Sequence, residues 1–173
     1  MTSAPLPDIE GAIHLLKSED VQIRQMMAYL LGQVGDSRAI EPLIDALEDA
    51  DVGVRGAAAN ALGALGDQAA VPYLKPMLRA DNAQMVVWAA FALTKLGHDR
   101  FDVLGGALET GDVMVRRSAI LAMQQLADDR AIPLLLSVYH DPERRFSADN
   151  TVGEAAAKAL VKLGYNVGGL PPR

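Results

Sequence analysis

Apolar residues recur along this chain at the spacing of an amphipathic helix. Between residues 52 and 65, valine, alanine and leucine fall at positions i, i+4, i+7, i+8 and i+11, so they share one helical face. The residues of this stripe are Val54, Ala58, Ala61, Leu62 and Leu65. Similar stripes follow along the chain. The hydrophobic pattern therefore predicts an all-α protein with no strands.

The helical pattern is repeated at a nearly constant interval. Each unit closes near Leu-x-x-Leu-Gly or a variant of it, and the closings are about 30 residues apart, with a longer last interval, as in repeat proteins. The closing residues are Gly35, Gly66, Gly97, Ala127 and Gly164. A shorter apolar segment precedes each closing helix, so every unit holds two helices. We predict repeats at about 8–35, 36–66, 67–97, 98–127 and 128–164, an N-terminal extension at 1–7 and a C-terminal tail at 165–173.

Charged residues mark where the second helices of several repeats begin. An aspartate stands before the helix and is expected to cap it, and an arginine follows the aspartate by four residues. The aspartates are Asp20, Asp51 and Asp112, and the arginines are Arg24, Arg55 and Arg116. We expect these Asp–Arg pairs to link into a ladder between repeats. One helix pair cannot bury its own apolar stripe, so the pairs should stack into a solenoid.

Repeat 2 carries a motif that resembles a known family. Residues 51–67 read Asp-Val-x-Val-Arg-x-x-Ala-Ala-x-Ala-Leu-Gly-x-Leu-Gly-Asp, and Ala-Val-Pro-x-Leu follows at 70–74. The motif closely resembles the short HEAT-like repeat of bacteria and archaea, of the phycobilisome-lyase type, over nearly the whole chain. The resemblance implies a right-handed α-solenoid of about five two-helix repeats. Val86 and Gly153 replace the motif's arginine, so the Asp–Arg ladder should be interrupted in repeats 3 and 5.

The resemblance also implies where a partner would bind. In this family the second helix of each repeat lines the concave face, and its variable positions lie around the Val-Arg pair and after the Ala-Ala pair. Carried over to this chain, those positions include Met26 and Tyr29 in repeat 1, Gly56, Ala57 and Asn60 in repeat 2, Gln84, Val87, Trp88 and Phe91 in repeat 3, Met114, Arg117, Ser118 and Leu121 in repeat 4, and Glu154, Ala155 and Lys158 in repeat 5.

The second helix of repeat 3 stands out on its residues alone, because it is apolar on two faces. Its predicted core stripe is Met85, Ala89, Ala92, Leu93 and Leu96. Val87, Trp88 and Phe91 point away from that stripe, and Trp88 and Phe91, three residues apart, share a face. The small residues of repeat 2 beside them suggest a depression walled by aromatics. An apolar patch with a polar rim is typical of a binding surface, and Trp, Tyr and Arg are its usual anchors.

Two other arrangements would hide this patch. The long connection 138–149 or the apolar tail 165–173 would cover it by folding back. Alternatively, a second copy of the chain would cover it in a homodimer formed through Trp88 and Phe91. The connection also holds Arg144 and Arg145, which we interpret as part of a solvated loop.

The composition does not point to catalysis. The absence of cysteine excludes a disulfide framework, a thiolate zinc site and a Cys nucleophile. The three histidines, His14, His98 and His140, lie in different repeats, and the His-Glu pairs of di-iron HEAT-like hydroxylases are missing. We therefore expect no catalytic residue, no cofactor and no metal.

Charge and hydropathy exclude two more classes. The net charge is −6, and the charged concave positions are Arg117 and Lys158 against Glu154, so nucleic-acid binding is not expected. The longest apolar run, Met85–Leu93, is too short to span a bilayer, and the N-terminus has no apolar signal region. We expect a cytoplasmic protein that does not associate with membranes.

These observations favour a non-enzymatic scaffold or adaptor that binds a protein or peptide segment on the concave face. Apolar anchors around Trp88 would supply the affinity, and Arg117 and Asn60 would orient the partner. The resemblance leaves a second function open, that of a bilin or tetrapyrrole lyase or chaperone-type subunit. An aromatic groove would hold the pigment, and Arg117 would pair with its propionates.

Overall fold

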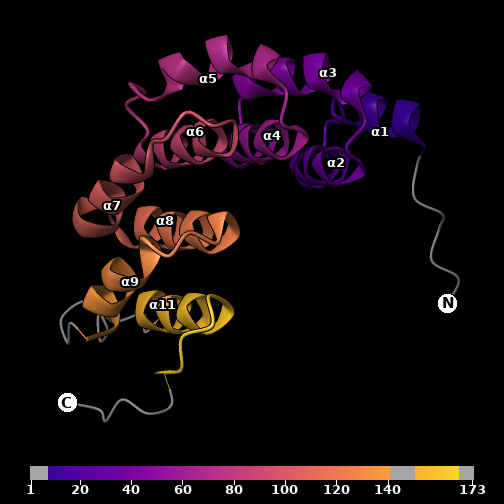
Figure 1. The fold of residues 1–173 in the computed structure, drawn as a ribbon. Coiled ribbons are helices and arrows are strands. Elements are labelled where there is room, and N and C mark those ends of the chain that lie inside the picture. The colour runs from indigo at the N-terminus through magenta and orange to yellow at the C-terminus, as the bar shows by residue number, and fades with distance from the viewer. Residues whose placement is uncertain (1–7, 141–150, 168–173) are drawn as a thin grey trace, which may run out of the picture.

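The computed structural model describes residues 8–140 and 151–167, and in these residues it contains ten α-helices and no strand. The helices form two layers (Figure 1). The outer layer contains α1 (Ile9–Leu15), α3 (Ile40–Asp45), α5 (Val71–Met77), α7 (Phe101–Thr110) and α9 (Ala131–His140). The inner layer contains α2 (Val21–Val34), α4 (Val52–Leu65), α6 (Ala83–Lys95), α8 (Val113–Leu126) and α11 (Thr151–Lys162). Short 3₁₀ turns at Ser37–Ala39, Ala46–Glu48 and Gln68–Ala70 flank the outer helices α3 and α5. The expected all-helical solenoid of five helix pairs is confirmed.

The array changes direction at α6. The inner helices pack in sequence order, α2 on α4, α4 on α6, α6 on α8 and α8 on α11. Figure 1 shows α2, α4 and α6 in one row, while α8 and α11 run off at an angle from the end of that row. The surface of the inner helices that faces away from the outer layer is the inner face, and it curves around this corner.

The helix ends follow the local rules expected from the sequence. Every predicted closing residue has a positive φ: 75° at Gly35, 76° at Gly66, 84° at Gly97, 52° at Ala127 and 83° at Gly164. Asp20, Asp51 and Asp112 each accept hydrogen bonds from backbone N–H groups in the first turn of the following helix. Local chemistry therefore sets the start and end of these helices.

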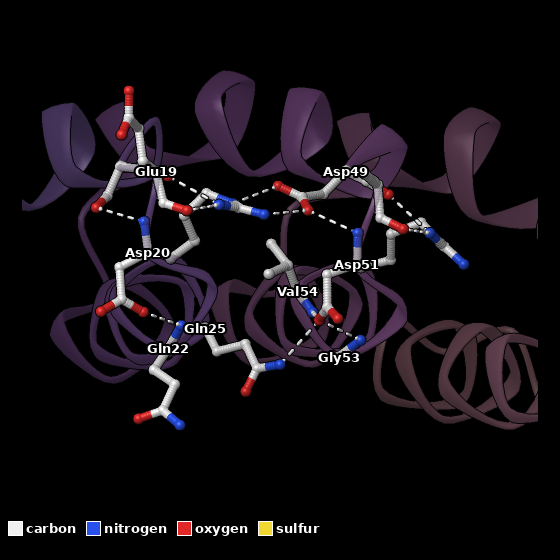
Figure 2. Close-up of polar contacts among 12 residues, drawn as sticks. Glu19, Asp20, Gln22, Gln25, Asp49, Asp51, Gly53 and Val54 are labelled. Carbon is white, nitrogen blue, oxygen red and sulfur yellow. Dashed lines mark hydrogen bonds and ion pairs between the residues drawn. The ribbon is translucent and has the colours of Figure 1, made fainter.

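The ladder between repeats 1 and 2 exists, but its pairing differs from the i,i+4 expectation (Figure 2). Arg24 Nε and Nη2 donate to the two carboxylate oxygens of Asp49 at 2.7 and 2.9 Å, instead of bonding Asp20. The Asp20 carboxylate accepts from the backbone of Gln22, because it caps α2. Arg55 has no carboxylate at the corresponding position and donates to the carbonyl of Asp49 at 2.7 Å. The aspartate after the outer helix therefore binds the arginine of the preceding repeat, and the cap Asp51 adds a second link by accepting from Gln25 Nε2 at 2.9 Å.

The Arg24–Asp49 pair predicts a pH-dependent contribution to stability. Both side chains are 13% exposed, and the Arg24 guanidinium lowers the pKa of Asp49 below its ordinary value. A lowered folded-state pKa gives stability that is present above the unfolded pKa and is lost as the pH falls through the folded pKa. We expect Asp49→Asn to lower the free energy of unfolding by about 1–2 kcal/mol at pH 7. In denaturant titrations the difference in free energy of unfolding between wild type and Asp49→Asn should shrink below about pH 4. A difference that stays constant with pH would show that the Arg24–Asp49 pair does not cause it.

The hydrophobic core has two parts that meet at α6. Ala92, Leu93 and Leu96 belong to the first part, which is built from α1 to α6. Val87 and Phe91 belong to the second part, which is built from α6 to α11 and which we call the second core. The corner helix therefore buries two faces, one against each half of the array.

The inner helices α2, α4 and α6 approach each other very closely. A Cβ atom added at Gly32 of α2 would lie 2.7 Å from the Cα atom of Ala61 in α4. One added at Gly63 of α4 would lie 2.9 Å from the Cα atom of Ala92 in α6. Both distances are well below van der Waals contact, so these two positions require glycine for the observed spacing.

Candidate partner-binding surface

The inner face contains a hollow of about 480 Å³ between α6, α8 and α11. Its lining residues are Gln84, Trp88, Met114, Arg117, Ser118, Ile120, Leu121, Gln124, Glu154, Ala155 and Lys158. All of them except Ile120 and Gln124 stand at positions that the family resemblance assigned to the concave face. Three helices from three different repeats thus supply one continuous lining, which we call the inner hollow.

Trp88 forms one wall of the inner hollow. Its indole lies across Gly56 of α4, since a Cβ there would come within 2.8 Å of Cδ1 and 2.9 Å of Nε1. The Phe91 ring meets the indole edge-on, with centroids 6.1 Å apart and planes at 90°. Trp88 is therefore half-buried. Gly56 and Phe91 contact its indole, and the rest of the side chain lines the hollow. The indole covers the small residue where the sequence suggested a depression.

Val87 and Phe91 are not available to a partner, and the prediction that they belong to the partner-binding patch is wrong. Both side chains are 0% exposed and belong to the second core, together with Leu104 of α7 and Ile120 of α8. The physical reason is the change of direction at α6, which brings α7 and α8 over the second apolar face of that helix. The sequence showed that this face is apolar, but not which neighbour covers it.

Three other predicted residues lie outside the inner hollow. Met26 and Tyr29 on α2 are 53% and 56% exposed, and Asn60 on α4 is half-buried. None of the three is among the residues that line the hollow. The structure therefore brings Trp88, Arg117 and Leu121 together. The lining also includes Met114, a predicted concave-face residue that is 57% exposed, and Gln124, which the sequence analysis did not single out.

The charged groups of the inner hollow come from α8 and α11. Arg117 and Lys158 are exposed, and neither forms an ion pair within the described part of the chain. Glu154 supplies the acidic group of the lining. Gln84 Nε2 donates to Ser118 Oγ at 3.2 Å and ties α6 to α8 across the floor. The hollow thus combines an indole and aliphatic groups with two cationic side chains.

The coverings considered from the sequence are only partly within the described residues. Tyr165 and Val167, at the start of the tail, pack against the second core. Residues 1–7, 141–150 and 168–173, with Arg144 and Arg145, lie outside the described residues. In the described ranges no helix combines the length and hydropathy needed to cross a membrane. Within those ranges no three His, Asp or Glu side chains are grouped as metal ligands would be.

Comparison with solved structures finds several helical repeat proteins. The complex of CpcE and CpcF of phycocyanin lyase from Nostoc sp. PCC7120 is 29% identical, with a TM-score of 0.54, over 94% of this chain and 67% of that one. Human deoxyhypusine hydroxylase is 19% identical, with a TM-score of 0.52, over 89% of this chain and 73% of that one. An engineered protein is 22% identical, with a TM-score of 0.50, over 91% of this chain and 80% of that one. The last two likenesses concern the fold alone.

Sequence comparison agrees with the repeat architecture. A search of curated protein sequences finds no match. The family model of HEAT repeats matches residues 9–94 and 87–148, which together span most of the chain. By this match and by its stacked helix pairs, the chain belongs to the HEAT repeat family.

Proposed function

We propose that this chain is a non-enzymatic adaptor that binds a segment of another protein in the inner hollow. The observation that carries the proposal is the setting of Trp88, a large aromatic side chain held between Gly56 and Phe91 with one side left open. A rigid, partly exposed tryptophan that shares a hollow with an arginine is typical of an interface hot spot. The likeness to a solved complex of two proteins supports a protein partner.

The hollow should need little rearrangement to bind. Its wall and floor stand on three packed helices, and the Gln84–Ser118 hydrogen bond holds two of them in register. A preformed surface loses little conformational entropy on binding, so a few apolar anchors are enough for useful affinity. Leu121 and Met114 extend the apolar area next to the indole.

The test is affinity capture with Trp88→Ala, read by quantitative mass spectrometry. A hot-spot residue contributes at least about 2 kcal/mol, so the variant should bind any true partner about 30-fold more weakly. The matched control is Tyr73→Ala, because Tyr73 is an aromatic side chain 55% exposed on the outer helix α5 and should leave binding unchanged. Circular dichroism must show that both variants keep their helix content. Equal capture by Trp88→Ala and wild type would reject the inner hollow as the site.

A second copy of the chain is the alternative occupant of the same surface. Trp88 is the only tryptophan, so its emission reports directly on the hollow. A concentration-dependent blue shift, together with a dimer in sedimentation analysis that Trp88→Ala abolishes, would assign the surface to self-association.

A tetrapyrrole-handling role is the second candidate function. The likeness to the phycocyanin lyase structure, at 29% identity over nearly the whole chain, is the observation that favours it. Arg117 and Lys158 would pair with the propionates of a bilin seated against Trp88. Biliverdin added to the protein would then show a shifted absorbance band that Trp88→Ala removes. An unshifted spectrum at saturating pigment would eliminate this role and leave the adaptor proposal intact.

A further inference from the structure

We propose that the bound segment is acidic where it meets α8 and α11, and apolar without acidic side chains where it continues over α4 and α2. This inference rests on the proposed function and specifies the chemistry and the direction of the partner. It comes from the uneven distribution of charge along the inner face.

The α8 and α11 end of the inner face offers cations and hydrogen-bond donors. Arg117 and Lys158 line the hollow from adjacent helices, and neither has a carboxylate partner among the described residues. The amide group of Gln124 adds a further donor to the lining, whereas the amide of Gln84 already donates to Ser118. Glu154 offsets one of the two positive charges, so the lining keeps a net positive charge. A carboxylate is the protein group that best matches the guanidinium and the ammonium of this lining.

The α2 and α4 end has a different character. The positions that the family resemblance assigns to the concave face here hold glutamine, asparagine, glycine and apolar residues, and none of these residues is charged: Val21, Gln22, Gln25, Met26, Tyr29, Val52, Gly53, Gly56, Ala57 and Asn60. Figure 2 shows Gln22 and Gln25 on the side of α2 away from the outer helices, while the Arg24–Asp49 pair lies between the layers. Met26 and Tyr29 are both more than half exposed. The Asp51 carboxylate lies on the same side and accepts from Gln25 Nε2 at 2.9 Å, so this end suits apolar side chains and disfavours acidic ones.

The net charge of the chain limits how acidic the partner can be. The chain carries a formal charge of −6, so a strongly acidic partner would be repelled at long range. At physiological salt such forces fade over about 8 Å, whereas a contact with Arg117 and Lys158 acts at closer range. The structure therefore points to a small number of carboxylates placed beside apolar residues, and not to a polyanion.

The test is a selection of random 12-residue peptides displayed on phage against the immobilised full chain. Peptides eluted from wild type but not from Trp88→Ala define binders of the inner hollow. We expect Asp or Glu next to Leu, Ile or Phe to be enriched among them. When the double variant Arg117→Glu/Lys158→Glu is the immobilised target, we expect Lys or Arg to be enriched in the selected peptides instead of Asp or Glu. These two side chains are exposed, so the variant should keep its fold, which circular dichroism checks.

The most enriched peptide then measures the charge contribution directly. Two exposed ion pairs together are worth about 1.4 kcal/mol, so Arg117→Gln/Lys158→Gln should weaken binding about tenfold. The same loss should follow when Gln replaces the acidic residues of the peptide. This inference would be overturned if the Trp88-dependent peptides were not enriched in Asp or Glu. It would also be overturned if neither Arg117→Gln/Lys158→Gln nor the Gln-substituted peptide changed the affinity. Either result would leave the adaptor proposal standing. Failure to recover any Trp88-dependent peptide would count against both.

The direction is tested by photo-crosslinking. A benzophenone placed at the apolar end of the selected peptide should crosslink to α2 or α4, and one at the acidic end to α8 or α11, as located by mass spectrometry of the digested protein. The reverse distribution would overturn the proposed direction. Crosslinks at Tyr73 on the outer face would place the peptide outside the inner hollow and overturn the inference as a whole.

Discussion

Phe91→Ala is expected to lower the free energy of unfolding by about 3–5 kcal/mol, which corresponds to a fall of roughly 10 °C in the midpoint of thermal unfolding. Phe91 is 0% exposed and is among the largest fully buried side chains of the protein. Its ring contacts the Trp88 indole and belongs to the second core at the corner helix α6. Removal of the ring would open a cavity where α7 and α8 meet α6, and packed helices fill such a cavity only in part.

Two matched substitutions separate burial from binding. Phe91→Leu keeps most of the volume and should cost clearly less than Phe91→Ala. Trp88→Ala removes a larger side chain, but one that is only half-buried, and should therefore cost less stability while affecting partner binding more. Thermal unfolding followed by circular dichroism ranks the three variants. A Phe91→Ala protein as stable as wild type would mean that α6 does not bury this face against α7 and α8.

Gly32→Leu is expected to destabilise the protein by about 3 kcal/mol, near the upper end of overpacking effects. The first atom of any side chain at this position would meet the Cα atom of Ala61 at 2.7 Å. A backbone atom cannot swing aside as a flexible side chain can, so α2 and α4 would have to separate. Separation of these helices would also disturb the Arg24–Asp49 pair that joins the same two repeats.

Gly106→Leu is the matched control for this substitution. Gly106 is an exposed residue within α7, and a Cβ atom added there would meet nothing within 4 Å. The same chemical change should therefore stabilise the protein by up to about 1 kcal/mol, because leucine favours helix more than glycine does. Denaturant titrations of the two variants should give shifts of opposite sign. A stabilising shift for Gly32→Leu would refute the close approach of α2 and α4.

The fold could be predicted almost completely from the sequence, because it depends on interactions between near neighbours in the chain. The stripe of Val54 and Leu62, repeated at a regular interval, requires helices that stack on one another. Asp51 caps α4 and Gly66 ends it through contacts that span only a few residues. Even Ala127, an unusual residue for a left-handed conformation, was recognisable from its place in the repeat.

The candidate site could be predicted only in part. The resemblance to HEAT-like repeats placed Trp88, Arg117 and Leu121 on the concave face, and the structure gathers them around the inner hollow. It does not gather Met26 and Tyr29 there, because α2 lies at the far end of the row from α8 and α11. A repeat pattern specifies which positions share a type of surface, but not which repeats are close enough to form one site.

The sequence by itself determined the helices, their ends, the repeat and the apolar faces of each helix, since all of these follow from periodicity and local hydrogen bonding. Only the tertiary structure decided that Val87 and Phe91 lie in the core and that Arg24 pairs with Asp49. The reason is that a local pattern states which face must be covered, whereas the covering element depends on the angle between successive repeats. That angle results from packing summed over the whole array. At α6 the angle places α7 and α8 over the second apolar face of the helix, so α6 lies where the two parts of the core meet.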